Sequence, residues 1–334
     1  MKQYKVCVIG CGVICENHLR PLSEMENVTI VGVCDILPER AERMAEKYHC
    51  PAYTDYQVLL AEQKPDAAHL CLPHYLHSVV AVYCLEHGVD VLSEKPMDAH
   101  YEGALAMAEA AERTGRKLGV IFQNRYNAGS VLAKRTVECG KYGKLLSLSG
   151  LVMWHRDEAY YKDGEWRKSY ETSGGGVIIN QAIHTLDLMR WLANSTPKTV
   201  SATVSHHGDT TAEVEDTTEG VITFENGAKC LYYFSINNGQ DDCIRVNATL
   251  EGASIEIIGG RCRVQYADGT EEWDTPSANN FTGAKAVYGT SHGTQIEEFY
   301  REGAEEAVRQ TMREALLTQE LIHKIFAAAG KPQK

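Results

Sequence analysis

The sequence predicts an α/β protein with a parallel sheet in its first part and an antiparallel sheet in its second part. Three observations support this fold class. The chain has 334 residues, which exceeds one typical domain and suggests two. Apolar runs alternate with helix-like segments as far as residue 122, whereas residues 199–267 contain β-rich runs separated by short turns.

The first part is predicted to alternate regularly between strands and helices. Apolar runs typical of strands occupy residues 5–9, 30–34, 67–72, 89–92 and 118–122, and helix-like segments lie near 14–25, 38–48, 55–62, 75–87 and 100–114. This alternation indicates a parallel sheet with helices on both faces, in which ligands bind at the carboxyl ends of the strands. It ends near residue 123, so we predict domains at 1–123 and 124–334.

The second part is predicted to begin with a helix near 128–139 and a strand at 145–155. The β-rich runs lie at residues 200–204, 220–224, 230–234, 245–250 and 254–258, and the tail from 294 to 329 has a helical composition. Strands in hairpin succession form an antiparallel sheet. One face of this sheet should cover helices, and the other is broad enough to be an oligomer interface.

The composition excludes several classes of partner. Hydrophobic residues make up 44% of the chain and charged residues 23%, as in globular proteins with a sizeable core. There is no apolar run of about 18 residues and no signal-peptide pattern, so we expect a cytoplasmic protein. A net charge of −12 argues against a nucleic acid or an anionic membrane as the partner. We expect a small molecule or another copy of the chain.

The cysteine pattern does not indicate a metal site. Eleven cysteines are present, most of them within apolar runs, and no Cys-x-x-Cys pair occurs. Cys7, Cys11 and Cys15 share a four-residue spacing, but they span a predicted strand, turn and helix rather than one helical face. Free cysteines in apolar runs behave as small buried hydrophobes, and their number favours a reducing compartment.

A glycine turn follows the first predicted strand. Gly10 allows a tight turn and Gly12 lets a ligand approach the backbone, while Cys15 replaces the third glycine of a dinucleotide fingerprint. The unpaired N–H groups of the following helix can hold a pyrophosphate. Asp35 ends the next strand, where a carboxylate accepts the ribose hydroxyls and repels a 2′-phosphate. We predict NAD rather than NADP, held by Gly10, Gly12, Val13, Ile14 and Asp35; the alternative is an ordinary strand–turn–helix with a capping Asp.

Two further polar segments follow strands of the same sheet. Pro73, His74 and His77 come after the strand at 67–72, where we predict that they contact the cofactor, and Glu94-Lys95-Pro96 comes after the strand at 89–92. Pro96 restricts the backbone of Lys95, so the lysine is aimed by a stiff segment. A lysine beside a nicotinamide cation is shifted toward its neutral form, which suits acid–base chemistry. The alternatives are a solvated lysine and capping histidines.

The glycine turn, Asp35, the Pro73 to His77 segment and above all Glu94-Lys95-Pro96 resemble the family of glucose–fructose oxidoreductase and inositol dehydrogenase, known as Gfo/Idh/MocA. The resemblance covers nearly the whole chain. It implies a Rossmann domain followed by an α/β domain with an open, mostly antiparallel sheet, and oxidation of a sugar or cyclitol hydroxyl with NAD or NADP. It also implies cofactor contacts for Glu94, Lys95 and Gln123, a substrate contact for Asn124, and a homodimer or homotetramer formed through the C-terminal sheet.

A polar strip is expected on one helix of the second domain. Residues 177–192, written as a helix, place Asn180, His184 and Asp187 on one face, where burial without partners would cost about 1–3 kcal/mol per group. In the family a histidine on this helix faces the nicotinamide and an acid lies four residues before it. His184 matches, but Asn180 stands at the acid position and cannot take a proton. The general base therefore stays open between Lys95 and His184, and Asp187 is expected either to orient the histidine or to cap the packing.

An aromatic segment between strand and helix is interpreted as a polyol pocket. Rings can cover C–H surfaces while charged groups bind hydroxyls, and the sequence offers Trp154, Tyr161 and Arg167 for these roles. His292 is a weaker candidate. The charge balance favours neutral or zwitterionic polyols, although Arg125, Arg156 and Arg167 could bind a carboxylate or phosphate.

The expected function is hydride transfer between a secondary alcohol of a sugar, glycoside or cyclitol and NAD, with Lys95 or His184 taking the hydroxyl proton. Two alternatives come from the family resemblance. One is a glycoside-cleaving enzyme in which tightly bound NAD acts in a transient oxidation. The other is a non-catalytic NAD-binding regulator, which the presence of both Lys95 and His184 disfavours.

Overall fold

The structure, a computed structural model, describes residues 2–162, 164–208, 210–275 and 291–331. The chain forms two compact units: residues 1–121 with 292–316, and residues 122–291 with 317–334. Each unit is described by itself below. The predicted boundary at residue 123 stays a prediction, but the contacts assign residues 292–316 to the first unit, which the sequence pattern did not indicate.

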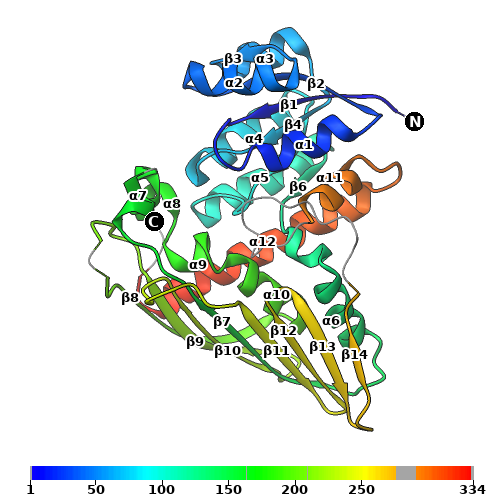
Figure 1. Cartoon of the computed structure of the whole chain (residues 1–334), viewed down its shortest axis with the longest axis vertical. Helices are drawn as coiled ribbons and strands as arrows, with labels where there is room; N and C mark the ends of the chain where they lie inside the picture. The colour runs from blue at the N-terminus through cyan, green and yellow to red at the C-terminus, as the bar shows by residue number, and fades with distance from the viewer. Residues whose placement is uncertain (1, 163, 209, 276–290, 332–334) are drawn as a thin grey trace. The chain divides into compact units, whose positions relative to one another are not determined.

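The first unit contains a six-stranded parallel sheet with the strand order β3-β2-β1-β4-β5-β6 (Figure 1). Its strands are β1 (Tyr4–Ile9), β2 (Val28–Cys34), β3 (Ala52–Tyr53), β4 (Ala67–Leu70), β5 (Asp90–Ser93) and β6 (Leu118–Val120). The intervening helices are α1 (Glu16–Glu24), α2 (Pro38–Tyr48), α3 (Tyr56–Gln63), α4 (His77–Glu86) and α5 (Tyr101–Thr114). The predicted parallel sheet is therefore confirmed, and its strand order reverses between β1 and β4, where such sheets bind nucleotides.

The C-terminal helices return to the first unit. Helix α11 (His292–Tyr300) packs against α1. Its side chains Ile296, Phe299 and Tyr300 are buried in the core cluster that also contains Val8 and Leu19. Helix α12 (Glu305–Ala328) begins in the first unit, and its residues from Leu317 onward belong to the second.

The second unit is built on an eight-stranded sheet with the order β14-β13-β12-β11-β7-β10-β9-β8 (Figure 1). Its strands are β7 (Leu145–Met153), β8 (Pro197–Ser205), β9 (Thr217–Phe224), β10 (Lys229–Ser235), β11 (Arg245–Leu250), β12 (Ala253–Ile258), β13 (Arg261–Tyr266) and β14 (Glu271–Trp273). Strands β7 and β10 pair in parallel, and the other pairs are antiparallel. The predicted mostly antiparallel sheet is thus confirmed.

Besides α12 from Leu317 onward, the second unit has helices of its own along one stretch of the chain. They are η2 (Gln123–Tyr126), α6 (Ala128–Glu138), α7 (Glu158–Lys162), η3 (Glu165–Lys168), α8 (Tyr170–Ser173), α9 (Val177–Asn180) and α10 (Ile183–Ala193), of which α6, α9 and α10 contact the strands. Along β10, Cys230, Tyr232 and Phe234 are buried, whereas Leu231 is 53% and Tyr233 38% exposed. Alternation along the strand therefore leaves an open face with apolar side chains.

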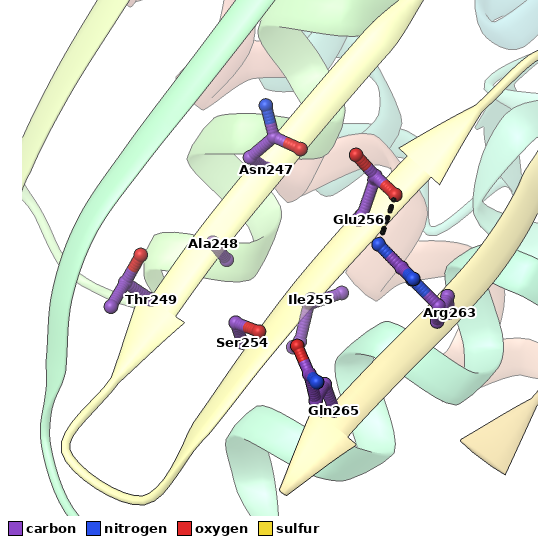
Figure 2. Close-up of a pocket in the computed structure, with 8 residues that line it drawn as sticks. All are labelled: Asn247, Ala248, Thr249, Ser254, Ile255, Glu256, Arg263 and Gln265. Carbon is purple, nitrogen blue, oxygen red and sulfur yellow. Dashed lines mark hydrogen bonds and ion pairs between the residues drawn. The ribbon is translucent and has the colours of Figure 1, made fainter. Parts of the chain in front are cut away.

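A shallow depression of about 200 Å³ lies on the sheet across β11, β12 and β13 (Figure 2). Most of its lining is polar, and an ion pair between Arg263 and Glu256 (3.0 Å) crosses it. None of the predicted site residues lines it. The depression is therefore a feature of the sheet surface and not the candidate active site.

The prediction of one continuous helix over residues 177–192 is wrong. The segment forms two helices, α9 and α10, which are interrupted at Gln181 and Ala182. The N–H of Ala182 donates to the carbonyl of Val177, five residues back, at 2.8 Å instead of closing a regular α-helical turn. Asn180 therefore ends one helix while His184 and Asp187 lie on the next.

Candidate active site

The glycine turn of the first unit lies between β1 and α1. Gly10 has φ of 98°, and a Cβ at this position would overlap the backbone carbonyl of Cys71. The Cys11 N–H donates to Asp35 Oδ2 (2.8 Å), and the Leu37 N–H donates to Asp35 Oδ1 (2.9 Å). The buried carboxylate of Asp35 is thus fixed against the turn at the end of β2, where the sequence predicts the adenosine ribose.

The turn leaves open space in front of α1. A Cβ built on Gly12 would meet no atom within 4 Å, so packing within the protein does not require a glycine here. The neighbouring Val13 is 97% exposed and Ile14 is partly exposed. A glycine with free space at a helix N-terminus fits the close approach of a pyrophosphate, and these residues therefore suit a dinucleotide.

Lys95 is the second residue after β5 and is partly buried. Its backbone N–H donates to Oε2 of Glu94 at 3.2 Å, and its peptide bond to Pro96 is cis. Glu94 is buried, and its Oε1 lies 3.1 Å from His18 Nε2 and 3.3 Å from His292 Nε2. Burial alone would raise the pKa of Glu94, but the hydrogen bonds from the two histidines hold that pKa well below its usual range. Glu94 is therefore an ionised support behind Lys95.

A buried chain of hydrogen bonds leads away from Glu94. His18 Nδ1 lies 2.8 Å from His69 Nδ1, and His69 Nε2 lies 2.8 Å from the Tyr300 hydroxyl. Because an ionised carboxylate accepts only, His18 donates from Nε2 to Glu94, accepts at Nδ1 from His69, and His69 accepts at Nε2 from Tyr300. Burial lowers the pKa of both His18 and His69, which agrees with neutral rings. Sequence reasoning missed this chain because His69 sits within an apolar run.

His74 and His77 follow β4 and are both buried. His74 begins the short helix η1 (His74–Leu76). His77 Nδ1 lies 2.7 Å from the Pro96 carbonyl oxygen and its Nε2 lies 2.9 Å from the Leu72 carbonyl oxygen. The ring therefore joins the segment after β4, which contains Pro73, to the segment after β5.

In the second unit, the buried His184 lies near the start of α10. Its ring meets the Phe122 ring edge-on, with the ring centroids 5.8 Å apart. Helix α10 contacts η2, which carries the buried Gln123 and Asn124. Among the described residues, no group hydrogen-bonds to Oδ1 of Asn124. A buried acceptor of this kind suits a ligand hydroxyl.

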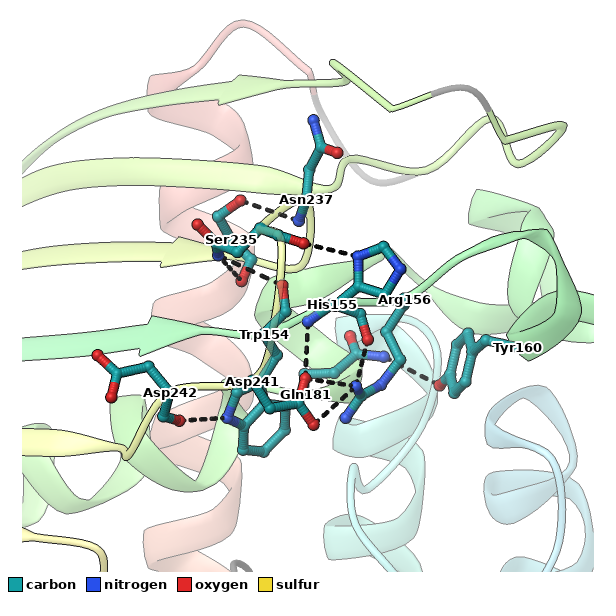
Figure 3. Close-up of polar contacts among 10 residues, drawn as sticks. Trp154, His155, Arg156, Tyr160, Gln181, Ser235, Asn237, Asp241 and Asp242 are labelled. Atoms are coloured by element: carbon teal, nitrogen blue, oxygen red, sulfur yellow. Dashed lines mark hydrogen bonds and ion pairs between the residues drawn. The ribbon is translucent and has the colours of Figure 1, made fainter.

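The structure brings Tyr160, rather than Tyr161, to the end of α9. Tyr161 is 2% exposed and packs with Ala212 and Val214, and its role as a substrate contact stays a prediction. The Tyr160 hydroxyl instead accepts from Gln181 Nε2 at 2.9 Å (Figure 3). Burial raises the pKa of Tyr160, opposed by nearby Arg167 and by hydrogen bonds that include one to Asn180.

Gln181 is a candidate that sequence reasoning missed. Gln181 is 4% exposed, and within the described part of the chain its Oε1 has no hydrogen-bond partner. The signal was present, since an amide beside Asn180 in an otherwise apolar helix needs partners. Like Asn124, it offers a buried acceptor to a hydroxyl group.

Trp154 and the arginines surround the same segment. Trp154 is almost fully buried and donates from Nε1 to the Asp242 carbonyl at 3.1 Å, so it supports the segment rather than exposing its ring (Figure 3). The Arg156 guanidinium lies over Trp154 and pairs with Asp241 at 3.0 Å. The Arg167 guanidinium carbon lies 5.3 Å from the Tyr160 ring centre. Arg167 is therefore placed beside the cluster.

The Asp187 carboxylate holds Arg125 in a buried ion pair. The carboxylate accepts from Arg125 Nε at 2.7 Å and from Nη2 at 2.5 Å, and the Thr318 hydroxyl donates to it at 2.6 Å. Burial alone would raise the pKa of Asp187, but Arg125 and its other partners hold that pKa below its usual value. Arg125 is thereby held in place by a buried ion pair, and its role toward a ligand anion stays a prediction.

Comparison with known proteins identifies the family. The description "Oxidoreductase family, NAD-binding Rossmann fold" matches residues 4–122, and "GFO/IDH/MocA C-terminal domain" matches residues 131–264. The chain belongs to the Gfo/Idh/MocA family of oxidoreductases. This confirms the resemblance, the Rossmann-type sheet and the accompanying α/β sheet.

Individual members of the Gfo/Idh/MocA family show its range. The chain is 30% identical to an inositol 2-dehydrogenase of Salmonella paratyphi B over 70% of each protein. It is 29% identical to a 2,7-anhydro-N-acetylneuraminate hydratase of Mediterraneibacter gnavus, over 81% of this chain and 72% of that protein. A structure of the WlbA dehydrogenase from Chromobacterium violaceum with NADH and UDP-GlcNAcA is similar with a TM-score of 0.84 and 26% identity, covering 99% of this chain and 94% of that one.

Among the described residues, no group of three or more His, Cys, Asp or Glu side chains is arranged to hold a metal ion. Over the same residues, no helix combines the length and the apolar character needed to cross a membrane.

Proposed function

We propose that the protein is an NAD-dependent dehydrogenase that transfers hydride between a secondary alcohol of a sugar, glycoside or cyclitol and the nicotinamide. The observation that carries this proposal is Lys95 at the carboxyl end of β5, with its backbone fixed by the ionised Glu94. Ligands of parallel sheets bind at this edge. Membership of an oxidoreductase family that includes inositol 2-dehydrogenases supports the same reading.

The cofactor is proposed to lie along the glycine turn. Gly10, Gly12, Val13 and Ile14 would hold the pyrophosphate, and Asp35 would accept the ribose hydroxyls and disfavour the 2′-phosphate of NADP. NAD, when bound, supplies the hydride acceptor. The segments after β4 and β5, with Pro73, His74, His77, Glu94 and Lys95, and Gln123 from η2 are proposed to complete its surroundings.

The substrate is proposed to bind to side chains around α9 and η2. Asn124 and Gln181 offer buried acceptors to hydroxyl groups, and Asn180 can do the same while being unable to take a proton. Lys95 or His184 would take the hydroxyl proton as the carbon loses hydride. The other predicted contacts, Tyr161, Arg167 and Trp154, are proposed to line the same pocket, and Trp154 also supports its own segment through the hydrogen bond to Asp242.

The test is absorbance of reduced nicotinamide when the purified protein is mixed with NAD or NADP and a panel of cyclitols, free sugars and glycosides. Signal with one substrate class, lost in Lys95→Ala but retained in the control Lys141→Ala, would support the dehydrogenase. Lys141 is exposed in a turn of the second unit, so the control removes a lysine of no proposed role. Absence of signal with every class would contradict the proposal.

A second candidate is a reaction without net oxidation, in which tightly bound NAD acts transiently. The specific observation is the similarity to a 2,7-anhydro-N-acetylneuraminate hydratase over 81% of this chain. Such an enzyme would release product, detected by mass spectrometry, without lasting reduced nicotinamide. If neither reduced nicotinamide nor a released product is detected while NAD stays bound, the result would favour a regulator.

We also propose that copies of the chain associate as a homodimer or homotetramer through the open face of the second sheet. Val221, Leu231 and Tyr233 expose apolar area on neighbouring strands β9 and β10. Exposed apolar patches mark interaction sites. Light scattering of the native protein and of Leu231→Glu tests this, since a monomer in both would contradict it. The cytoplasmic location stays a prediction.

A further inference from the structure

Glu215 is a buried carboxylate that the proposed chemistry does not use. It is 1% exposed and lies just before β9. Its carboxylate accepts the Gly176 N–H (2.9 Å) and the Ile178 N–H (3.2 Å), and its backbone carbonyl accepts the Val177 N–H (3.0 Å). The first N–H groups of a helix have no partner within the helix. Glu215 therefore supplies the partners for the first turn of α9.

These contacts of Glu215 with the first turn of α9 form a clamp, and α9 connects this clamp to the candidate site. Asn180 is the last residue of α9, and the Ala182 N–H donates to the Val177 carbonyl at 2.8 Å. The Leu186 N–H in turn donates to the Ala182 carbonyl at 2.9 Å, within the helix that carries His184. The position of the first turn of α9 is thus transmitted through backbone hydrogen bonds to both polar residues.

The glycines before α9 are explained by the same packing. A Cβ on Gly176 would overlap the backbone carbonyl of Glu215. Gly175 has φ of 152°, and a Cβ there would meet the Phe326 ring at 2.7 Å. The two glycines are therefore packed between the Glu215 backbone and α12. Of the described groups that contact this segment, the Glu215 carboxylate is the one whose charge can change.

No basic side chain in the described part of the chain neutralises Glu215. Within the described residues, its carboxylate has no hydrogen bond or ion pair with a Lys, Arg or His side chain. The titratable groups that face or flank it are the phenols of Tyr161 and Tyr170 and the acids Glu213 and Asp216. The histidine His206 also lies nearby, with its ring held by the Val214 carbonyl. Burial raises the pKa of Glu215 to about 7, opposed by the backbone N–H donors.

We propose that Glu215 is a positioning residue whose ionised carboxylate holds the first turn of α9 and thereby sets Asn180 and His184, so that turnover increases as Glu215 loses its proton. Protonation removes the negative charge on which the Gly176 and Ile178 N–H groups converge, and it places an O–H among donors. The clamp is therefore weaker in acid. This inference rests on the proposed function for its effect on turnover, but not for the titration itself.

The titration is measured first, on the whole protein, and needs neither a substrate nor a variant. With ¹⁵N-labelled glycine and isoleucine, the amide resonances of Gly176 and Ile178 are followed from about pH 5 to pH 9. We expect both to shift with one inflection near neutral pH. Resonances that stay constant across this range would overturn the inference.

Variants assign the inflection. Glu215→Gln should abolish it, whereas Glu225→Gln, which alters an exposed carboxylate paired with Lys198 just after β9, should leave it unchanged. If the Gln variant does not fold, Glu215→Asp is used in its place. This variant keeps the charge and should keep an inflection. An inflection that persists in Glu215→Gln belongs to another group and contradicts the assignment.

The second measurement is the pH profile of kcat/KM. In wild type, kcat/KM should fall by about tenfold in total as the pH drops through the inflection. In Glu215→Gln the fall in kcat/KM that is due to Glu215 should be absent. Above the inflection, the kcat of this variant should be about tenfold below that of wild type, while its NAD affinity is unchanged. An identical profile in the variant would refute the positioning role. If no substrate is ever oxidised, the proposed function fails while the amide titration stands.

Discussion

Asp187→Asn is expected to reduce the free energy of unfolding by about 3–5 kcal/mol, because the change leaves a buried guanidinium without its counter-charge. The side chains of Asp187 and Arg125 are 1% and 7% exposed, and Arg190 Nη2 lies 3.8 Å from the same carboxylate. Asn has nearly the shape of Asp and leaves no cavity. The loss therefore comes from the charge and its hydrogen bonds and not from packing.

The assay is urea unfolding at neutral pH, comparing wild type, Asp187→Asn and the control Glu86→Gln. Glu86 forms an exposed pair with Arg113, so its loss should cost less than about 1 kcal/mol. If Asp187→Asn costs no more than the control, the charge argument is refuted. The pKa of Asp187 is held below its usual value, so its contribution is present at neutral pH and is lost as the pH falls through that lowered pKa. Wild type and variant should therefore converge in acid.

Three further predictions concern single groups. Gly10→Ala should weaken NAD binding roughly tenfold or more, because the added Cβ overlaps the Cys71 carbonyl. The control is Gly140→Ala, at a glycine with a similar positive φ and open space around it. This change should lower the free energy of unfolding by about 1 kcal/mol and leave the NAD affinity measured by calorimetry intact. Asp35→Ser should move the ratio of kcat/KM for NADP over NAD upward roughly tenfold, and an unchanged ratio would contradict its role. The pKa of Glu215 is raised from 4.5 to about 7, so wild-type stability should fall by about 3 kcal/mol as the pH rises between these values, and Glu215→Gln should lack this fall in urea unfolding.

The alternation of short apolar runs and helices predicted the parallel sheet because that signal is local. Helix α6 and strand β7 were predicted within two residues of their observed ends for the same reason. Strand β3 was missed since its two residues give no periodicity. The break between α9 and α10 was also missed, because Gln181 and Ala182 include neither Gly nor Pro.

Side-chain partners were less predictable than elements. Tyr160 and Tyr161 are adjacent, and only the phase of the five-residue helix α7 decides which one is buried. Glu215 belongs to no motif, and its partners are backbone N–H groups about forty residues earlier in the chain. Contacts of this kind depend on how distant segments pack, which local patterns do not record.

The return of α11 to the first unit has a consequence for synthesis. Phe299 and Tyr300 fill the same core as Val8 and Leu19, and Tyr300 ends the hydrogen-bond chain from His69. A nascent chain that has emerged only as far as the second sheet still lacks this part of the core. The first unit therefore cannot complete its core during translation until residues 292–316 have left the ribosome, although its sheet is made first.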